Sequence, residues 1–100
     1  MMSRSLSWAD ASVLGGETFT FFPGARPDGV GLRVLRVALR SGQPAMVQFS
    51  VVFAGPAEPV YPQGTYRFRH SRLGEFDFLV TPVAQTQLGT EYEACFSHAR

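Results

Sequence analysis

The side chains able to perform acid–base, nucleophilic or metal chemistry are few in this sequence: two histidines, one cysteine and eight carboxylates. His70 is the strongest candidate, because it ends an alternating row with Tyr66 and Phe68 at the tip of an expected hairpin. A partly buried imidazole there could act as a general base, or it could hydrogen-bond the adjacent loop. We favour the loop contact. His98 lies two residues from the end of the sequence, where fraying is expected.

The other candidates do not assemble into a recognisable catalytic or metal motif. Cys95 would be a reactive thiol only beside a cation, and none is adjacent to it in the sequence. Glu91 and Glu93 share one face of an expected strand, where two acids usually aid solubility. The sequence has no Cys-x-x-Cys or metalloprotease spacing and no phosphate-loop, dinucleotide or hydrolase motif. We therefore expect no enzyme activity, no metal and no cofactor.

Composition indicates one globular domain. Of 100 residues, 45% are hydrophobic and 13% aromatic, and eight acids nearly balance nine arginines to give a formal net charge of +1. Such near-neutrality argues against generic binding to nucleic acid or to a membrane. No signal-peptide pattern and no apolar run of about 20 residues is present, and a single cysteine fits a reducing compartment, so we expect a cytoplasmic protein.

A short helix and a strand should come first. Ser7 is a suitable N-cap for one or two helical turns over residues 8–13, and Gly15 and Gly16 would end them. Residues 17–22 then read as a strand, followed by a loop rich in turn formers over residues 23–29.

The segment from Val30 to Arg40 is ambiguous, because its leucines recur at helical spacing. Three valines and an alternation that becomes regular after a register shift near residues 34–35 favour a long strand with a bulge. A turn over residues 41–44 then leads into a strand within residues 46–55, where every second residue from Val47 to Phe53 is apolar.

A stiff connector and a strongly specified hairpin follow. Residues 56–63 include three prolines, which fix φ and lack a backbone donor, so this segment cannot be a helix or a central strand. Residues 64–70 and 75–80 alternate aromatic with charged residues, and a loop at residues 71–73 brings both faces into register. The expected cross-strand pairs are Arg69 with Glu75, Arg67 with Asp77, Phe68 with Phe76, and Tyr66 with Phe78.

The remainder completes an all-β domain. Residues 81–90 read as a polar return, and residues 91–97 as a last strand with Tyr92, Ala94 and Phe96 inward and Cys95 outward. Six strands without a long helix predict a single-domain, mainly antiparallel six-stranded small barrel or sandwich with a short N-terminal helix. The domain spans residues 1–100, with an N-terminal segment at 1–16 and a β core at 17–97.

Several motifs resemble a family of small, functionally uncharacterised bacterial all-β domains. They are "GETF" at residues 16–19, "GPAEPVYPQGTY" followed by "HSRLG" within residues 55–74, and "YEACF" at residues 92–96. The resemblance covers residues 16–96. It implies no established activity, only an accessory or structural role, with an association to phage-tail-like gene neighbourhoods.

The sequence therefore predicts a non-enzymatic module that acts through a protein partner or through self-association. The alternative is a small-ligand-binding β-barrel whose cavity is lined by Phe, Tyr and Trp8. In either case, some residues stand out as a structural framework with a potential functional role: Pro62, Gly64, Tyr66, Arg67, Arg69, His70, Glu75 and Asp77.

Overall fold

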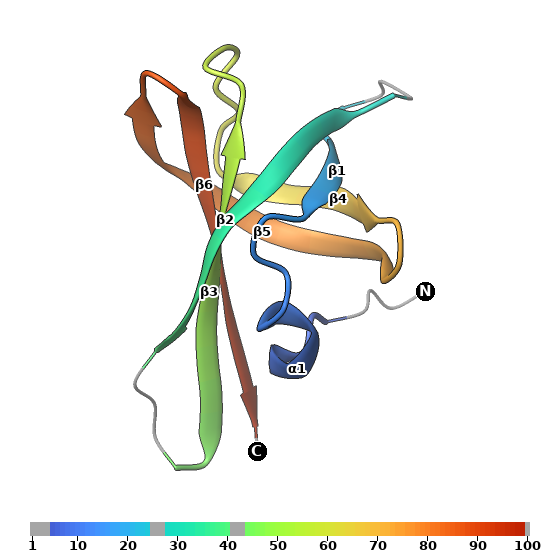
Figure 1. The fold of residues 1–100 in the computed structure, drawn as a ribbon, viewed down its shortest axis with the longest axis vertical. Coiled ribbons are helices and arrows are strands. Elements are labelled where there is room, and N and C mark those ends of the chain that lie inside the picture. The colour runs from blue at the N-terminus through green and yellow to red at the C-terminus, as the bar shows by residue number, and fades with distance from the viewer. Residues whose placement is uncertain (1–4, 25–27, 41–43, 100) are drawn as a thin grey trace.

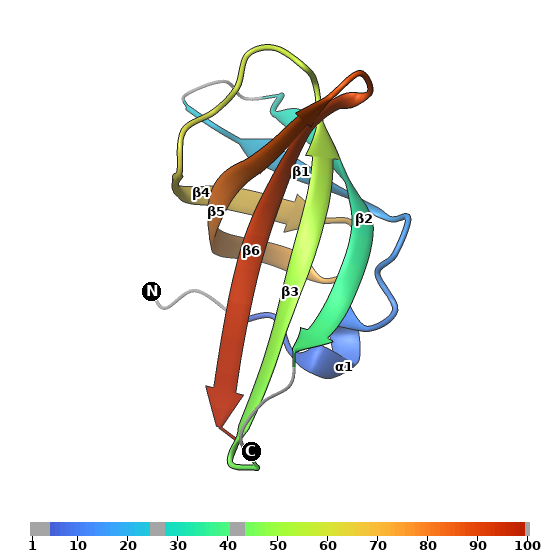
Figure 2. The same cartoon turned by 90° about the vertical axis from the view of Figure 1, so that its left-hand side faces the viewer.

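Six antiparallel strands form one sheet that closes on itself (Figures 1 and 2). The computed structural model describes residues 5–24, 28–40 and 44–99. Around the ring the strands run β1-β2-β3-β6-β5-β4, and β4 pairs with β1 to close it. The elements are α1 (Trp8–Ala11), β1 (Thr18–Phe22), β2 (Val30–Arg40), β3 (Met46–Gly55), β4 (Gly64–His70), β5 (Gly74–Thr86) and β6 (Gly89–Ala99). The predicted fold class is confirmed, in its barrel form.

Helix α1 begins as predicted but is shorter. The Asp10 N–H donates to Ser7 Oγ at 3.1 Å, which satisfies one of the free donors of the first turn. The helix ends at Ala11, and the Trp8 ring lies 5.4 Å from that of Phe49, so α1 packs against β3. The turns predicted at residues 23–29 and 41–44 include residues 25–27 and 41–43, which lie outside the described residues.

Strand β2 confirms the strand prediction over the helical alternative. It pairs with β3 from Arg33 to Arg40, and the register shifts between Val34 and Arg36. Leu35 is therefore the extra residue of a bulge, at the predicted position. The bulge keeps Val34 in the core, with 1% of its surface exposed, while Arg36 faces outward.

The β4–β5 hairpin has the predicted register. Arg69 pairs with Glu75 and Arg67 with Asp77 on one face, and the aromatic pairs on the other face also match. A slip of one residue would move the aromatic side chains to solvent, so the burial of this face specifies the register.

The predicted return over residues 81–90 is wrong. β5 continues to Thr86 and β6 begins at Gly89, so only Gln87 and Leu88 form the turn. Most of β5 beyond Pro82 is exposed on both faces, so its sequence shows no alternation of apolar and polar residues. β6 likewise continues past the predicted end at residue 97 to Ala99.

Aromatic side chains fill the centre of the closed sheet. Phe19 is fully buried, and its ring centroid lies between 5.6 and 6.3 Å from four other rings, those of Phe53, Phe68, Phe76 and Phe78. Aromatic pairs at such distances contribute about 0.5–1.5 kcal/mol beyond the area that they bury. Seven of the nine phenylalanines are buried, so they supply much of the core of a chain of 100 residues.

Three strands extend beyond the ring as an arm. β3 and β6 pair from Met46 with Ala99 through to Gly55 with Thr90, whereas β5 pairs with β6 only from Thr86 to Thr81. On the other side, β1 pairs with β2 only as far as Arg33. The arm consists of residues 36–40, 46–52 and 94–99, and Figures 1 and 2 show it extending past the β4–β5 hairpin.

Candidate functional site

His70 is buried at the end of β4 and is bonded through both ring nitrogens. Its Nε2 lies 2.7 Å from Glu17 Oε1, and its Nδ1 accepts the backbone N–H groups of Arg72 and Leu73, each at 3.1 Å. Only 3% of the residue is exposed, and its ring centroid lies 4.9 Å from that of Phe19. The predicted contact with the loop is confirmed: the imidazole holds the β4–β5 turn.

These contacts assign the hydrogen on the ring. Two N–H donors require a lone pair on Nδ1, so Nε2 carries the hydrogen and donates it to the Glu17 carboxylate. In this arrangement neither nitrogen is free to accept a proton from a substrate. The His70 and Glu17 pair has the composition of an acid–base dyad, but its geometry is that of a structural contact.

Glu17 joins the start of β1 to this turn. Its Oε1 also lies 3.4 Å from Arg72 Nη2. The hydrogen bond from His70 lowers the pKa of the Glu17 carboxyl, and the charge of Arg72 acts in the same direction, against the opposing effect of desolvation. Glu17 was not predicted as a partner, because it lies far from His70 in the sequence and only the pairing of β1 with β4 brings them together.

The four predicted charged residues of the hairpin form one network on its outer face. Arg67 Nε lies 2.7 Å from Asp77 Oδ1 and its Nη1 lies 2.6 Å from Glu75 Oε1, while Arg69 Nη2 lies 3.1 Å from Glu75 Oε2. The hydrogen bond to Asp77, followed by that to Glu75, raises the pKa of Arg67, and the hydrogen bonds from Arg67 and Arg69 lower the pKa of Glu75. The charges satisfy one another, which favours a role in register over a basic recognition patch.

The connector is fastened to the sheet through tyrosines. The Tyr66 hydroxyl donates to the Pro62 carbonyl at 2.6 Å, and a Cβ at Gly64 would lie 3.4 Å from the Tyr66 ring. The Tyr61 N–H donates to the Tyr92 hydroxyl at 3.0 Å. Burial of Tyr92 raises the pKa of its phenol. The predicted residues Pro62, Gly64 and Tyr66 thus lie together, and they serve to position backbone.

Two ion pairs that the sequence did not predict cross the outer face of β3. Arg36 Nη2 lies 3.2 Å from Glu91 Oε1, and Arg40 Nη2 lies 3.1 Å from Glu93 Oε2. These pairs link β2 to β6 over the intervening strand, and Val52 between them is only 4% exposed. The acids Glu91 and Glu93 therefore tie the arm together.

Both outer edges of the arm lack a backbone partner among the described residues. On β2, the contacts with the β1 side end where Val34 bonds to Gly16 and Glu17, so residues 36–40 pair only with β3. On β6, residues 94–99 pair only with β3, because β5 pairs with β6 only from Thr81 onward and its residues before Thr81 diverge from β6. Each edge therefore presents free N–H and C=O groups.

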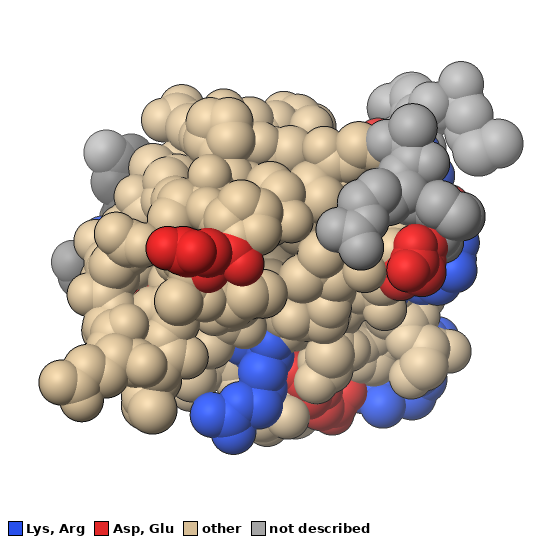
Figure 3. Space-filling view, turned by 90° about the horizontal axis from the view of Figure 1, so that it is seen from above, with Lys and Arg blue, Asp and Glu red and all other residues tan. Residues whose placement is uncertain are grey.

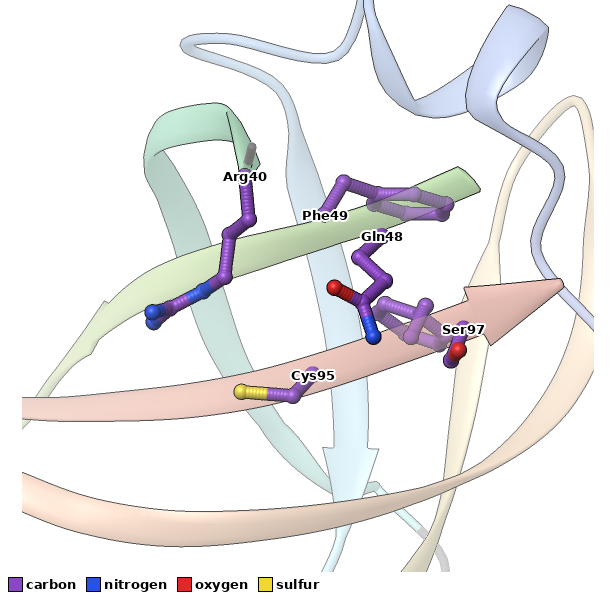
Figure 4. A pocket seen from close by; sticks show the side chains of 6 residues that line it. Arg40, Gln48, Phe49, Cys95 and Ser97 are labelled. Atoms are coloured by element: carbon purple, nitrogen blue, oxygen red, sulfur yellow. The ribbon is translucent and has the colours of Figure 1, made fainter. Parts of the chain in front are cut away.

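Surface hollows lie beside these elements. One of about 340 Å³ is on the arm, where Figure 4 shows Arg40, Gln48, Cys95 and Ser97 on three adjacent strands. Cys95 is exposed, as predicted. Another, of about 310 Å³, lies between Arg33 and the β5–β6 turn. Figure 3 looks onto that end of the molecule, most of which is uncharged, and Leu88 in the turn is 96% exposed.

Within residues 5–24, 28–40 and 44–99, no group of three His, Cys, Asp or Glu side chains is placed to hold a metal ion. No helix in these ranges is long and apolar enough to cross a membrane.

Comparison with known proteins gives a match to a family. The sequence profile of a family described as a domain of unknown function matches residues 6–96. The chain belongs to the DUF6916 family. No curated protein and no solved structure matches it. The DUF6916 match confirms the predicted membership of an uncharacterised family of small domains, and it begins before α1, ahead of the predicted start at residue 16.

Proposed function

We propose that this DUF6916 domain is a non-enzymatic module that acts through protein contacts, as a structural accessory or as a self-associating unit. The observation that carries the proposal is the pair of open edges on the arm, at residues 36–40 and 94–99. An exposed strand edge can accept a strand from another chain, with backbone hydrogen bonds giving affinity and side chains giving specificity.

The use of the polar side chains supports the same proposal. His70 and Glu17 bond to each other, and the arginines of the hairpin bond to its acids. A catalytic site needs polar groups that are left free to meet a substrate. In this domain the groups best suited to chemistry serve to hold turns and strand register.

The proposal is tested by retention of partners from the source lysate on the immobilised domain. The test variant carries Ala38→Lys and Ser97→Lys, which place a charge on the outer face at each open edge. The matched control is Leu79→Lys, at an exposed position on β5. We expect a protein that is retained by wild type and by the control and lost from the edge variant.

Two results would contradict the proposal. One is retention that is unchanged in the edge variant. The other is turnover of a substrate by the purified domain that His70→Ala abolishes while circular dichroism shows an intact fold.

A second candidate function is binding of a small anionic ligand in the hollow at the β5–β6 turn. Arg33 lines this hollow together with Leu35 and Leu88. Glu91 also lines it but pairs with Arg36, and no carboxylate among the described residues pairs with Arg33. A ligand at about 100 times its dissociation constant adds about 2.7 kcal/mol of stability, which thermal-shift screening detects. An unchanged melting temperature across a library of organic anions would count against this function.

A further inference from the structure

The two open edges of the arm differ in charge and in the features that prevent an edge strand from pairing with another chain. The outer face of β2 carries Arg36 and Arg40 within its open segment. The open segment of β6, residues 94–99, reads Ala-Cys-Phe-Ser-His-Ala and contains no Lys, Arg, Asp, Glu or Pro. Its pairing with β3 shows no register shift, so it has no bulge. In natural proteins, charges, prolines or bulges commonly keep an exposed edge strand from pairing with another chain, and the β6 edge has none of these.

We propose that the open edge of β6 pairs antiparallel with the same edge of a second copy, across a twofold axis. The inference rests on the proposed function and names its partner. A twofold contact places identical segments side by side, so an edge that carries charges would meet the same charges on the second copy. The charge of each edge therefore decides which one can form such a contact. Two β6 edges bring no like charges together, whereas two β2 edges would bring Arg36 and Arg40 of both copies together.

No strand among the described residues covers this edge, and the segment before α1 reaches it only through the side chain of His98, whose Nε2 lies 2.9 Å from the Leu6 carbonyl oxygen. Figure 2 shows no strand beside the lower half of β6 on the side away from β3. The result would be a continuous six-stranded sheet in the order β2-β3-β6-β6-β3-β2. Phe96, which is only partly buried and stacks on Phe49 at 4.9 Å, would gain apolar neighbours from the second copy.

Side-chain direction requires the twofold axis to pass a residue, and two such registers pair the most residues of the open segment. A twofold axis perpendicular to the sheet keeps the same face of both copies on the same side, so opposed residues must share a face. Cys95, Ser97 and Ala99 lie on the outer face, and Phe96 and His98 on the inner face. Within the open segment, the axis therefore passes either Ser97, which opposes Ser97 to itself, or Phe96, which opposes Cys95 to Ser97.

Sedimentation equilibrium over a range of concentrations is the first test. We expect a monomer–dimer equilibrium for wild type, and at least a tenfold increase, on the order of that from an unfavourable like-charge contact, in the dissociation constant of Ser97→Lys. The matched variant Ala38→Lys adds the same charge to the same face at the other edge, and we expect a change of less than about twofold. Circular dichroism checks that each variant is folded.

Disulfide cross-linking tests the register. Directly opposed residues in antiparallel strands have Cα atoms about 4.5–5.5 Å apart, a spacing that a disulfide spans. An axis at Ser97 predicts a covalent dimer of the variant Cys95→Ser with Ser97→Cys. An axis at Phe96 predicts no covalent dimer of that variant and one of Ser97→Cys with the native Cys95. Cys95→Ser with Gln48→Cys, one strand inward on the same face, should form no covalent dimer in either case.

Other outcomes would overturn the inference. The first is a wild type that is monomeric at every concentration. The second is a dimer that Ala38→Lys dissociates and Ser97→Lys does not. The third is assembly beyond a dimer, which indicates head-to-tail pairing of β6 with β2. The proposed function fails on separate results: retention of lysate partners that is unchanged in the variant with both edges altered, or a substrate turnover that His70→Ala abolishes while the fold stays intact.

Discussion

Replacing His70 with alanine removes a buried ring together with the acceptor for two backbone N–H groups. Truncation of a large buried side chain typically costs about 2–5 kcal/mol, and loss of the acceptor for two N–H groups places a variant in the upper part of that range. Because His70 is 3% exposed and its Nδ1 accepts from Arg72 and Leu73, we expect His70→Ala to lower the free energy of unfolding by about 3–5 kcal/mol. That is a large share of the stability of a small domain.

Two further variants separate the contacts of the ring. In His70→Asn, the side-chain oxygen lies close to the position of Nδ1 and can accept from the turn, but it cannot reach Glu17. In His70→Gln, the amide lies close to the position of Nε2 and can donate to Glu17, but it leaves the turn without an acceptor. Each should cost less than alanine, about 1–3 kcal/mol.

The assay is urea unfolding followed by circular dichroism, together with amide exchange at Arg72 and Leu73. Exchange at both amides should accelerate in His70→Ala and His70→Gln and remain slow in His70→Asn. Ser71→Ala is the control, because Ser71 lies exposed in the same turn, and it should change stability by less than about 0.5 kcal/mol. A cost below about 1 kcal/mol for His70→Ala, or equal amide exchange in the Asn and Gln variants, would refute the reasoning.

Three other predictions follow from single contacts. Gly89→Ala should cost about 1–3 kcal/mol in urea unfolding, because φ is +139° and an added Cβ would overlap the carbonyl oxygen of Gly55. Tyr92→Phe should cost about 1–3 kcal/mol and accelerate amide exchange at Tyr61, whose N–H loses its acceptor. Tyr92→Phe should also change the stability at alkaline pH. Because the pKa of the Tyr92 phenol is raised in the folded state, the phenol contributes its full stability below the ordinary value of 10.0, and this contribution is lost as pH rises through the folded pKa. The variant, which has no phenol to ionise, should lack this loss. Because the pKa of Glu17 is lowered in the folded state, the ionised carboxylate stabilises the domain above the ordinary value of 4.5, and this contribution is lost as pH falls through the folded pKa. Glu17→Gln should therefore make the free energy of unfolding depend less on pH on the acid side.

Each of these has a contrary result. A neutral Gly89→Ala would mean that the β5–β6 turn does not need its positive φ, and Gly24→Ala, where nothing lies within 4 Å of an added Cβ, is the control. For Tyr92→Phe, unchanged exchange at Tyr61 would show that the hydroxyl does not hold the connector. For Glu17→Gln, a free energy of unfolding that falls below pH 4.5 in parallel with that of wild type would show that another group causes the loss of stability in acid.

Elements whose two faces differ could be predicted from the sequence. The hairpin of residues 64–80 alternates charged with aromatic residues, so the burial of one face fixes strand, turn and register together. The bulge at Leu35 was predictable for a similar reason, because the apolar alternation on either side of it differs by one residue. His70 was placed correctly as the inward end of this alternation.

Features that depend on distant segments were not predictable. The end of β5 is exposed on both faces, so its backbone pairing with β6 left no pattern in its side chains. The partner of His70 lies directly before β1, and the partners of Arg36 and Arg40 lie two strands away on β6. Such pairs follow from the order of strands around the ring, which alternation within a strand does not determine.

The central claim is that the open edge of β6 pairs with the same edge of a second copy, and residue-resolved amide exchange of β6 tests it most directly. In an antiparallel sheet the N–H groups of an edge strand point alternately toward the neighbouring strand and toward the open side. Within residues 94–99, alternate amides should therefore exchange slowly through β3 and the others rapidly. We predict that the rapid set becomes protected as protein concentration rises, while residues 36–40 of β2 do not change. Rapid exchange of that set at every concentration, or new protection on β2, would contradict the account.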